Sequence, residues 1–183
     1  MELFEKTLTQ EYKFKGRIIN LRFDTALLPD GKTCTREVIE HNGGVTVAAI
    51  NDKKEIYLVN QYRYPYSEVV TETPAGKLEK DENPLEAGKR ELLEEAGVKA
   101  SKYYDLGRFY PTPGYCGETI YLYAATGLEL AEQNLDEDEF LNVVKMPLDE
   151  AVEKIISGEI TDGKTQAVIL KACMMIEKGI IKI

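Results

Sequence analysis

Three glutamates fall within five positions of the stretch GKLEKDENPLEAGKRELLEEAGV, residues 76–98. Glu91 and Glu95 are four residues apart and Glu94 is three after Glu91, so on a helix all three project from one face. Like charges at this spacing destabilise a helix by about 0.2–0.5 kcal/mol per exposed pair. A hard divalent cation, which prefers oxygen ligands, would relieve that repulsion. The pattern therefore indicates either a metal site or a solvated acidic surface.

The helix that carries these glutamates is expected over residues 83–97. Asn83 is a suitable N-cap, and Pro84 stands at the first helical position, where its missing N–H costs no hydrogen bond. Gly97 follows the last turn, where a left-handed residue commonly ends a helix. The glutamates are then expected near its C-terminal end, on a face shared by all three.

Most of the remaining chain is expected to form strands, with two more helices near the C-terminus. Residues up to about 40 form strands with too little apolar material for a core of their own. We therefore expect an α/β (α+β) fold, with a mixed sheet flanked by helices and a small N-terminal antiparallel sheet. The expected domains are 1–40 and 41–183. Strands are predicted at residues 7–14, 16–28, 33–41, 44–51, 56–65, 103–111, 119–128 and 140–147, and helices at 148–159 and 162–179.

Composition excludes several functional classes. The 183 residues include 23 basic and 32 acidic ones, a net charge of −9, which argues against nucleic acid as a partner because phosphate backbones require basic surface. The longest aliphatic run, residues 45–50, is too short to cross a bilayer, and the N-terminus lacks the apolar run of a signal peptide. Three cysteines with no close pair predict free thiols in a reducing cytoplasm.

The glutamates also belong to a longer pattern with fixed spacing. Five residues separate Gly76 from Glu82, and seven separate Glu82 from Arg90. Glu91, Leu92, Glu94, Glu95, Gly97 and Val98 then follow in order. This pattern resembles the signature of the Nudix hydrolases at every specified position. The resemblance implies an α/β/α sandwich whose loop–helix–loop holds Mg²⁺ or Mn²⁺ against a diphosphate.

The resemblance also implies roles for individual residues. The metal ligands would be Glu91, Glu94, Glu95 and the backbone carbonyl of Ala75, for two or more ions per site. Gly76 would let the backbone approach the substrate. Arg90 and Glu82 would orient the loop and the helix without taking part in the chemistry.

Stretches outside the signature resemble the ADP-ribose pyrophosphatase group of this family. They are TREVIEHNGGVTVAAI, VNQYRYP and FYPTPGYCGETIYLYAA. By this resemblance Arg63 contacts phosphate, Arg36 and Glu37 reach the adenosine part, Glu118 lies near the terminal ribose, and Pro113 shapes its loop. Each of these residues could instead be an ordinary surface or strand residue. The chain has no Trp, so adenine stacking would fall to Tyr12, Phe14 or Ile19.

A catalytic base is expected on the acidic loop of residues 132–140, where the group places a glutamate. We favour Glu139, just before a strand, and then Glu137. A carboxylate beside the attacking water can accept its proton.

The sequence thus favours Mg²⁺-dependent hydrolysis of ADP-ribose to AMP and ribose 5-phosphate. One alternative is the same chemistry on another sugar nucleotide or dinucleotide, such as GDP-mannose or NADH. Another, from a different class, is a non-catalytic module that senses ADP-ribose. The resemblance further implies a homodimer joined through residues 1–40, with Arg36 or Glu37 of one chain entering the site of the other.

Overall fold

The computed structural model describes residues 3–135 and 139–183. The chain divides into two compact units. One holds Met1–Gly43 and Tyr110–Thr119, and the other holds Gly44–Phe109 and Ile120–Ile183. Each unit is described by itself below. No helix among the described residues is long and apolar enough to cross a membrane.

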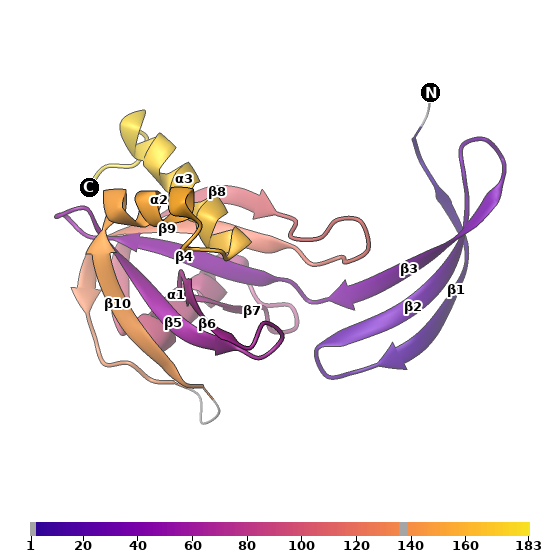
Figure 1. Cartoon of the computed structure of the whole chain (residues 1–183), viewed down its shortest axis with the longest axis horizontal. Coiled ribbons are helices and arrows are strands. Elements are labelled where there is room, and N and C mark those ends of the chain that lie inside the picture. The colour runs from indigo at the N-terminus through magenta and orange to yellow at the C-terminus, as the bar shows by residue number, and fades with distance from the viewer. Residues whose placement is uncertain (1–2, 136–138) are drawn as a thin grey trace. The chain divides into compact units, whose positions relative to one another are not determined.

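The larger unit is built on a seven-stranded mixed sheet (Figure 1). The main strand order is β10-β5-β4-β9-β8, with β6 paired to β5 and β7 paired to β4. Among the strand pairs that the described residues form in this sheet, β4 and β9 run parallel and the others are antiparallel. The strands are β4 Gly44–Ile50, β5 Glu55–Arg63, β6 Glu68–Glu72, β7 Ala75–Lys77, β8 Val98–Phe109, β9 Ile120–Leu130 and β10 Leu141–Pro147.

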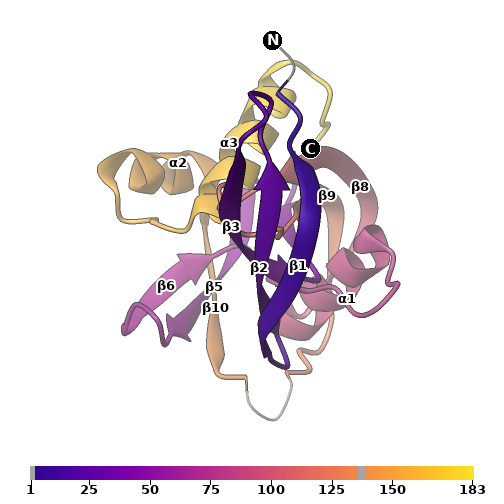
Figure 2. The ribbon, with the colours of Figure 1, turned by 90° about the vertical axis from the view of Figure 1, so that its right-hand side faces the viewer.

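Helices cover both faces of this sheet, with α1 (Pro84–Ala96) on one and α2 (Leu148–Ser157) and α3 (Gly163–Glu177) on the other (Figures 1 and 2). The alternation of β4 explains the two cores, because successive side chains of a strand point to opposite faces. Val45, Val47 and Ala49 pack with α1. Ala48 and Ile50 pack with α2 and α3. The larger unit is therefore the α/β/α sandwich with a mixed sheet that the sequence predicted.

Helix α1 begins and ends as its sequence predicted. The side chain of Asn83 accepts hydrogen bonds from the backbone N–H groups of Leu85 and Glu86, at 2.9 and 3.4 Å. Gly97 has a φ of 62°, in the left-handed region that favours glycine. Leu92 and Ala96 are buried on the side that faces the sheet. These signals fix which residues of the helix point toward the core.

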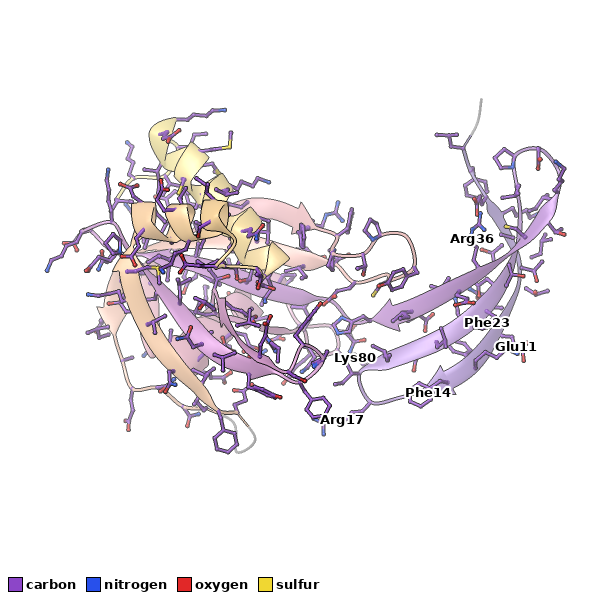
Figure 3. All side chains as sticks on the ribbon, in the orientation of Figure 1. Glu11, Phe14, Arg17, Phe23, Arg36 and Lys80 are labelled. Carbon is purple, nitrogen blue, oxygen red and sulfur yellow. The ribbon has the colours of Figure 1, made fainter. Side chains whose placement is uncertain are left out.

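The smaller unit is an antiparallel sheet in the order β1-β2-β3. Its strands are β1 Lys6–Lys15, β2 Ile19–Leu27 and β3 Thr33–His41. The segment Tyr110–Thr119 lies beside β3, since Ile39 N–H donates to Tyr115 O at 2.8 Å and Gly117 N–H donates to Ile39 O at 2.9 Å. Every residue of β1 is exposed, including Phe14, which Figure 3 labels on this sheet together with Phe23 of β2. The sheet has almost no core of its own, as expected.

Two strands were not predicted. β6 has five residues and β7 has three, one of them glycine, and so short a run carries no readable alternation. β8 also begins at Val98 rather than at residue 103, because the chain enters the strand directly after the glycine that ends α1. These differences matter because β7 pairs with Gly44–Thr46 of β4 and so places the backbone next to α1.

We expect Gly97→Ala to destabilise the larger unit more than Gly158→Ala does. Both glycines have positive φ, at 62° and 82°, and a left-handed conformation costs a residue with a Cβ about 1–2 kcal/mol. A Cβ at Gly97 would in addition lie 2.9 Å from the carbonyl oxygen of Ala131, whereas one at Gly158 would have no heavy atom within 4 Å. Urea unfolding of the two variants measures the difference, and equal losses would contradict the packing at Gly97.

Candidate functional site

The glutamate face of α1 is buried. Glu91 is 7% exposed and Glu95 is 3% exposed, while the side chain of Glu94 is 31% exposed. A solvated acidic surface does not describe Glu91 and Glu95, since their carboxylates lie out of water. Burying a charge is costly unless a partner of opposite sign compensates it. The two carboxylates therefore require a compensating charge or a proton.

The backbone of β7 lies directly against these two carboxylates. Ala75 N–H donates a hydrogen bond to Glu95 Oε2 at 2.8 Å. A Cβ at Gly76 would stand 1.8 Å from Glu91 Oε1, so any side chain there would force the carboxylate of Glu91 to move. The structure thus brings together Ala75, Gly76, Glu91 and Glu95, four residues that the sequence assigned to one site.

Arg90 connects the helix to the loop before it. Its Nη1 donates to Glu91 Oε1 at 2.8 Å and to Glu94 Oε2 at 3.0 Å. Its Nε and Nη2 donate to the two carboxylate oxygens of Glu82, at 3.1 and 3.2 Å. Glu82 in turn accepts from Glu79 N–H at 2.9 Å. Arg90 therefore orients the loop against the helix, as the sequence pattern implied.

The electrostatics of the site show an excess of negative charge. Burial raises the pKa of Glu95 to about 8, and the charges of Glu91 and Glu139 add to the effect. Burial also raises the pKa of Glu91, with smaller contributions from Glu94 and Glu139, although Arg90 acts in the opposite direction. Glu139 is among the charges that raise both pKa values, with a smaller contribution than burial. Glu137 lies outside the described residues.

These residues fit a divalent cation. Two buried carboxylates with raised pKa values lie against the backbone at Gly76 and form an oxygen-rich setting with an excess of negative charge. Over residues 3–135 and 139–183, no three acidic, His or Cys side chains already stand in a ligating group. Arg90 instead pairs with Glu91 and Glu94. A cation would take over the role of that guanidinium.

Arg63 lies at the end of β5 in the same unit and is paired with a buried glutamate. Its Nε and Nη2 donate to the two carboxylate oxygens of Glu72, at 2.5 and 2.6 Å. Lys164, at the start of α3, also pairs with Glu72 and with Asp162. Burial alone would raise the pKa of Glu72, but the hydrogen bonds and charges of Arg63 and Lys164 hold it below its ordinary value.

Glu72 and Lys164 were missed by the sequence reasoning. Glu72 is 2% exposed, and Lys164 is 92 positions away from it in the chain. A local pattern carries no signal for such a pair. One local feature could have drawn attention to Glu72. It lies just before the segment Pro74–Gly76, which contains the proposed metal-binding backbone.

The other candidate residues lie in the smaller unit. Arg36 pairs with Glu5, with its Nη2 2.8 Å from Glu5 Oε1, and Glu37 is exposed. Glu118 Oε1 lies 3.5 Å from His41 Nδ1. Pro113 is exposed within the segment Tyr110–Thr119. Their contacts with a substrate stay predictions.

Comparisons with known proteins identify the family of this chain. Residues 40–165 match the NUDIX domain, and residues 5–39 match the nucleoside diphosphate sugar hydrolase N-terminal domain. The ADP-ribose pyrophosphatase of Bacillus subtilis is 40% identical over 165 residues, 89% of each chain. The methanol dehydrogenase activator of Bacillus methanolicus is 43% identical over 163 residues, 88% of each. The GDP-mannose pyrophosphatase of Yersinia enterocolitica is 34% identical over 140 residues, 71% of this chain and 73% of that one.

A solved structure shows the same fold. The crystal structure of an ADP compounds hydrolase superposes with a TM-score of 0.85 at 19% identity, over 99% of this chain and all of that one. The domain match covers the glutamate helix and β7, which lie against each other, and also Arg63. The chain therefore belongs to the Nudix family of hydrolases and carries the N-terminal domain of its nucleoside diphosphate sugar hydrolases.

Proposed function

We propose that this protein hydrolyses the diphosphate bond of ADP-ribose and releases AMP and ribose 5-phosphate. The observation that carries the proposal is the pair of buried carboxylates, Glu91 and Glu95, packed against the Ala75–Gly76 backbone. Support for the substrate comes from proteins named ADP-ribose pyrophosphatase, 40% and 35% identical over 89% and 90% of this chain.

Divalent cations, Mg²⁺ or Mn²⁺ with two or more per site, complete the proposed machinery. Glu91, Glu94, Glu95 and the carbonyl of Ala75 would hold them. Bound there, the cations would stabilise the negative charge that builds on the phosphoryl oxygens. This assignment matches the excess of buried negative charge at the site. Without a cation, Arg90 is the positive group that pairs with Glu91 and Glu94.

The chain's own groups would position the substrate and move the proton. Arg63 uses two of its five N–H groups on Glu72, and the others would bind phosphate. Its pairing with a buried carboxylate fixes the direction of the guanidinium before substrate arrives. Glu139 would accept the proton of the attacking water, since its charge already acts on Glu91 and Glu95.

The smaller unit would supply the rest of the binding site across a homodimer. Arg36 and Glu37 would contact the adenosine part of a substrate held by the partner, and Glu118 and Pro113 would line the ribose end. The support is the fully exposed strand β1 and a sheet with little core, which favour pairing with a second chain.

Light scattering tests the homodimer and should give a mass near twice 20.6 kDa. A strictly monomeric protein would remove this part of the proposal.

We also propose a cytoplasmic location, because Cys34, Cys116 and Cys173 are free thiols, which persist in reducing compartments. Neither nucleic acid nor a membrane is a proposed partner, since the net charge is −9.

One assay separates ADP-ribose from the alternative substrates. Release of phosphatase-sensitive products would be measured with ADP-ribose, GDP-mannose, NADH and a diadenosine compound in parallel. GDP-mannose belongs in the panel because relatives 34% identical are named for that activity. ADP-ribose should give the highest kcat/KM. A higher value for another compound would change the substrate, and no hydrolysis at all would leave the non-catalytic sensing alternative.

Glu95→Gln should abolish most of the activity while the fold persists. The amide oxygen of glutamine can still accept from Ala75 N–H, but the charge for a cation is gone. Loss of a residue that only supports a metal ligand lowers activity by about 10- to 100-fold. Glu95 is itself a proposed ligand, so we expect a larger fall in turnover. Mg²⁺ should raise the melting temperature of the wild type and leave that of the variant unchanged. Glu86→Gln, on the exposed side of the same helix, is the matched control. A fully active Glu95→Gln, or activity unchanged in EDTA, would refute the metal site.

Glu139→Gln should lower kcat by about 10²–10⁴-fold and change KM little, because a base acts in the transition state. Glu132→Gln, in the exposed part of the same loop, should have no such effect. Steady-state kinetics on ADP-ribose distinguishes the cases. If only Glu137→Gln lowers kcat, the base is two positions earlier in the loop, and if neither does, the base lies elsewhere.

A further inference from the structure

Three threonine hydroxyls form a buried chain beside the proposed site. Thr46 comes from β4, Thr73 from the link between β6 and β7, and Thr165 from the first turn of α3, and all three are 0% exposed. Thr46 Oγ1 lies 2.6 Å from Thr73 Oγ1, which lies 3.2 Å from Thr165 Oγ1. None of these residues belongs to the proposed chemistry. They join elements that are 92 positions apart in the chain.

The carbonyl oxygen of Pro74, which can only accept, gives these hydroxyl hydrogen bonds one consistent direction. Thr46 Oγ1 donates to the carbonyl of Pro74 at 3.1 Å. A hydroxyl has a single proton, so Thr73 must donate to Thr46, and Thr165 must then donate to Thr73. Thr165 Oγ1 also accepts from the backbone N–H of Thr73 at 2.9 Å. Removal of one hydroxyl therefore leaves a buried partner unpaired, which is unfavourable because water cannot replace it.

The chain ends on the backbone that carries the site. The carbonyl of Pro74 accepts from Thr46 and also from Val47 N–H, at 3.0 Å. The next residue is Ala75, whose N–H donates to Glu95. The ring of Pro74 fixes its φ, and the two hydrogen bonds to its carbonyl hold the peptide unit that leads to Ala75. Ala75 is thus held through Glu95 from the α1 face of the sheet and through the hydroxyl chain from the α3 face.

The first turn of α3 is itself anchored. The side chain of Asp162 caps the helix by accepting from Thr165 N–H at 2.9 Å. Lys164 pairs with Glu72, one position before the threonine that Thr165 binds. Two consecutive residues of α3, Lys164 and Thr165, therefore bind two consecutive residues, Glu72 and Thr73, of the segment that leads into β7.

We propose that Thr165, acting through Thr73 and Thr46, is a positioning residue that sets where the Ala75–Gly76 backbone lies against Glu91 and Glu95. Thr165 does not touch substrate or cation in this proposal. Its effect on catalysis rests on the proposed function, whereas its effect on the backbone does not. The hydroxyl proton is the essential feature, because the two methyl-sized branches of valine fill the same space without continuing the chain.

The test compares Thr165→Val with Thr165→Ser and with Thr126→Val. Thr126 is a buried threonine of β9 that does not belong to the three-hydroxyl chain. The first readout is amide hydrogen exchange of the metal-free protein by NMR. Thr73 N–H loses its acceptor in Thr165→Val in any case, so the deciding amide is that of Ala75, whose partner Glu95 is untouched. Its exchange should accelerate about 10- to 100-fold in Thr165→Val, and return to the wild-type rate in Thr165→Ser.

The second readout is kinetic. Thr165→Val should lower kcat by about 10- to 100-fold, the size of effect that misplacement of a reacting group by about 1 Å produces, and change KM less than kcat. Thr165→Ser should recover most of kcat, and Thr126→Val should change neither readout. If Thr165→Val does not fold, Thr46→Val carries the same two tests, because Val47 N–H still binds the Pro74 carbonyl.

Two results would overturn the proposal. One is a lowered melting temperature in Thr165→Val with unchanged exchange at Ala75 and unchanged kcat, which would make the hydroxyl merely structural. The other is the same pair of effects in Thr126→Val, which would make them a consequence of general destabilisation. If the wild type hydrolyses none of the substrates, the proposed function fails, and exchange at Ala75 still decides whether Thr165 positions the backbone.

Discussion

The burial of the Glu91 and Glu95 carboxylates is the constraint on which the rest of this molecule depends. Two acids 7% and 3% exposed would repel each other and lose their hydration without compensation. The fold meets this cost in several ways, through the guanidinium of Arg90, the N–H of Ala75 and a raised pKa at Glu95. Two buried acids stabilise the fold less than apolar side chains in their place would. The same pair is well suited to binding a cation, which gives a reason for the burial of two acids here.

The same constraint explains the construction of β7. Its backbone must approach a carboxylate so closely that a single Cβ at Gly76 would overlap it. A three-residue strand has few hydrogen bonds with which to hold that position, and β7 has one pairing partner, β4, along Gly44–Thr46. The helices on both sides of the sheet supply the remaining support, α1 through Glu95 and α3 through the threonine chain. The site is therefore a property of the whole sandwich rather than of the glutamate helix alone.

The sequence predicted those parts whose signals are local. Asn83, Pro84 and Gly97 gave the limits of α1. Helical spacing also placed the three glutamates on one face, but it could not show which of them would be buried. That depends on β7, a strand too short to read from a pattern. Glu72, Lys164 and Thr165 were missed because their partners come from distant segments, and only the folded chain brings them together.

Binding of Mn²⁺ alone tests the central claim most directly, since it requires neither substrate nor turnover. Free Mn²⁺ would be followed by electron paramagnetic resonance during titration of the wild type and of Gly76→Ala. The variant keeps every carboxylate and adds one methyl group where Glu91 Oε1 now lies. We expect the wild type to bind Mn²⁺ and the variant to bind it about 10- to 100-fold more weakly, with Mg²⁺ competing for the same site. A wild type that leaves all Mn²⁺ free, or a variant that binds it equally well, would contradict a cation site built from these glutamates.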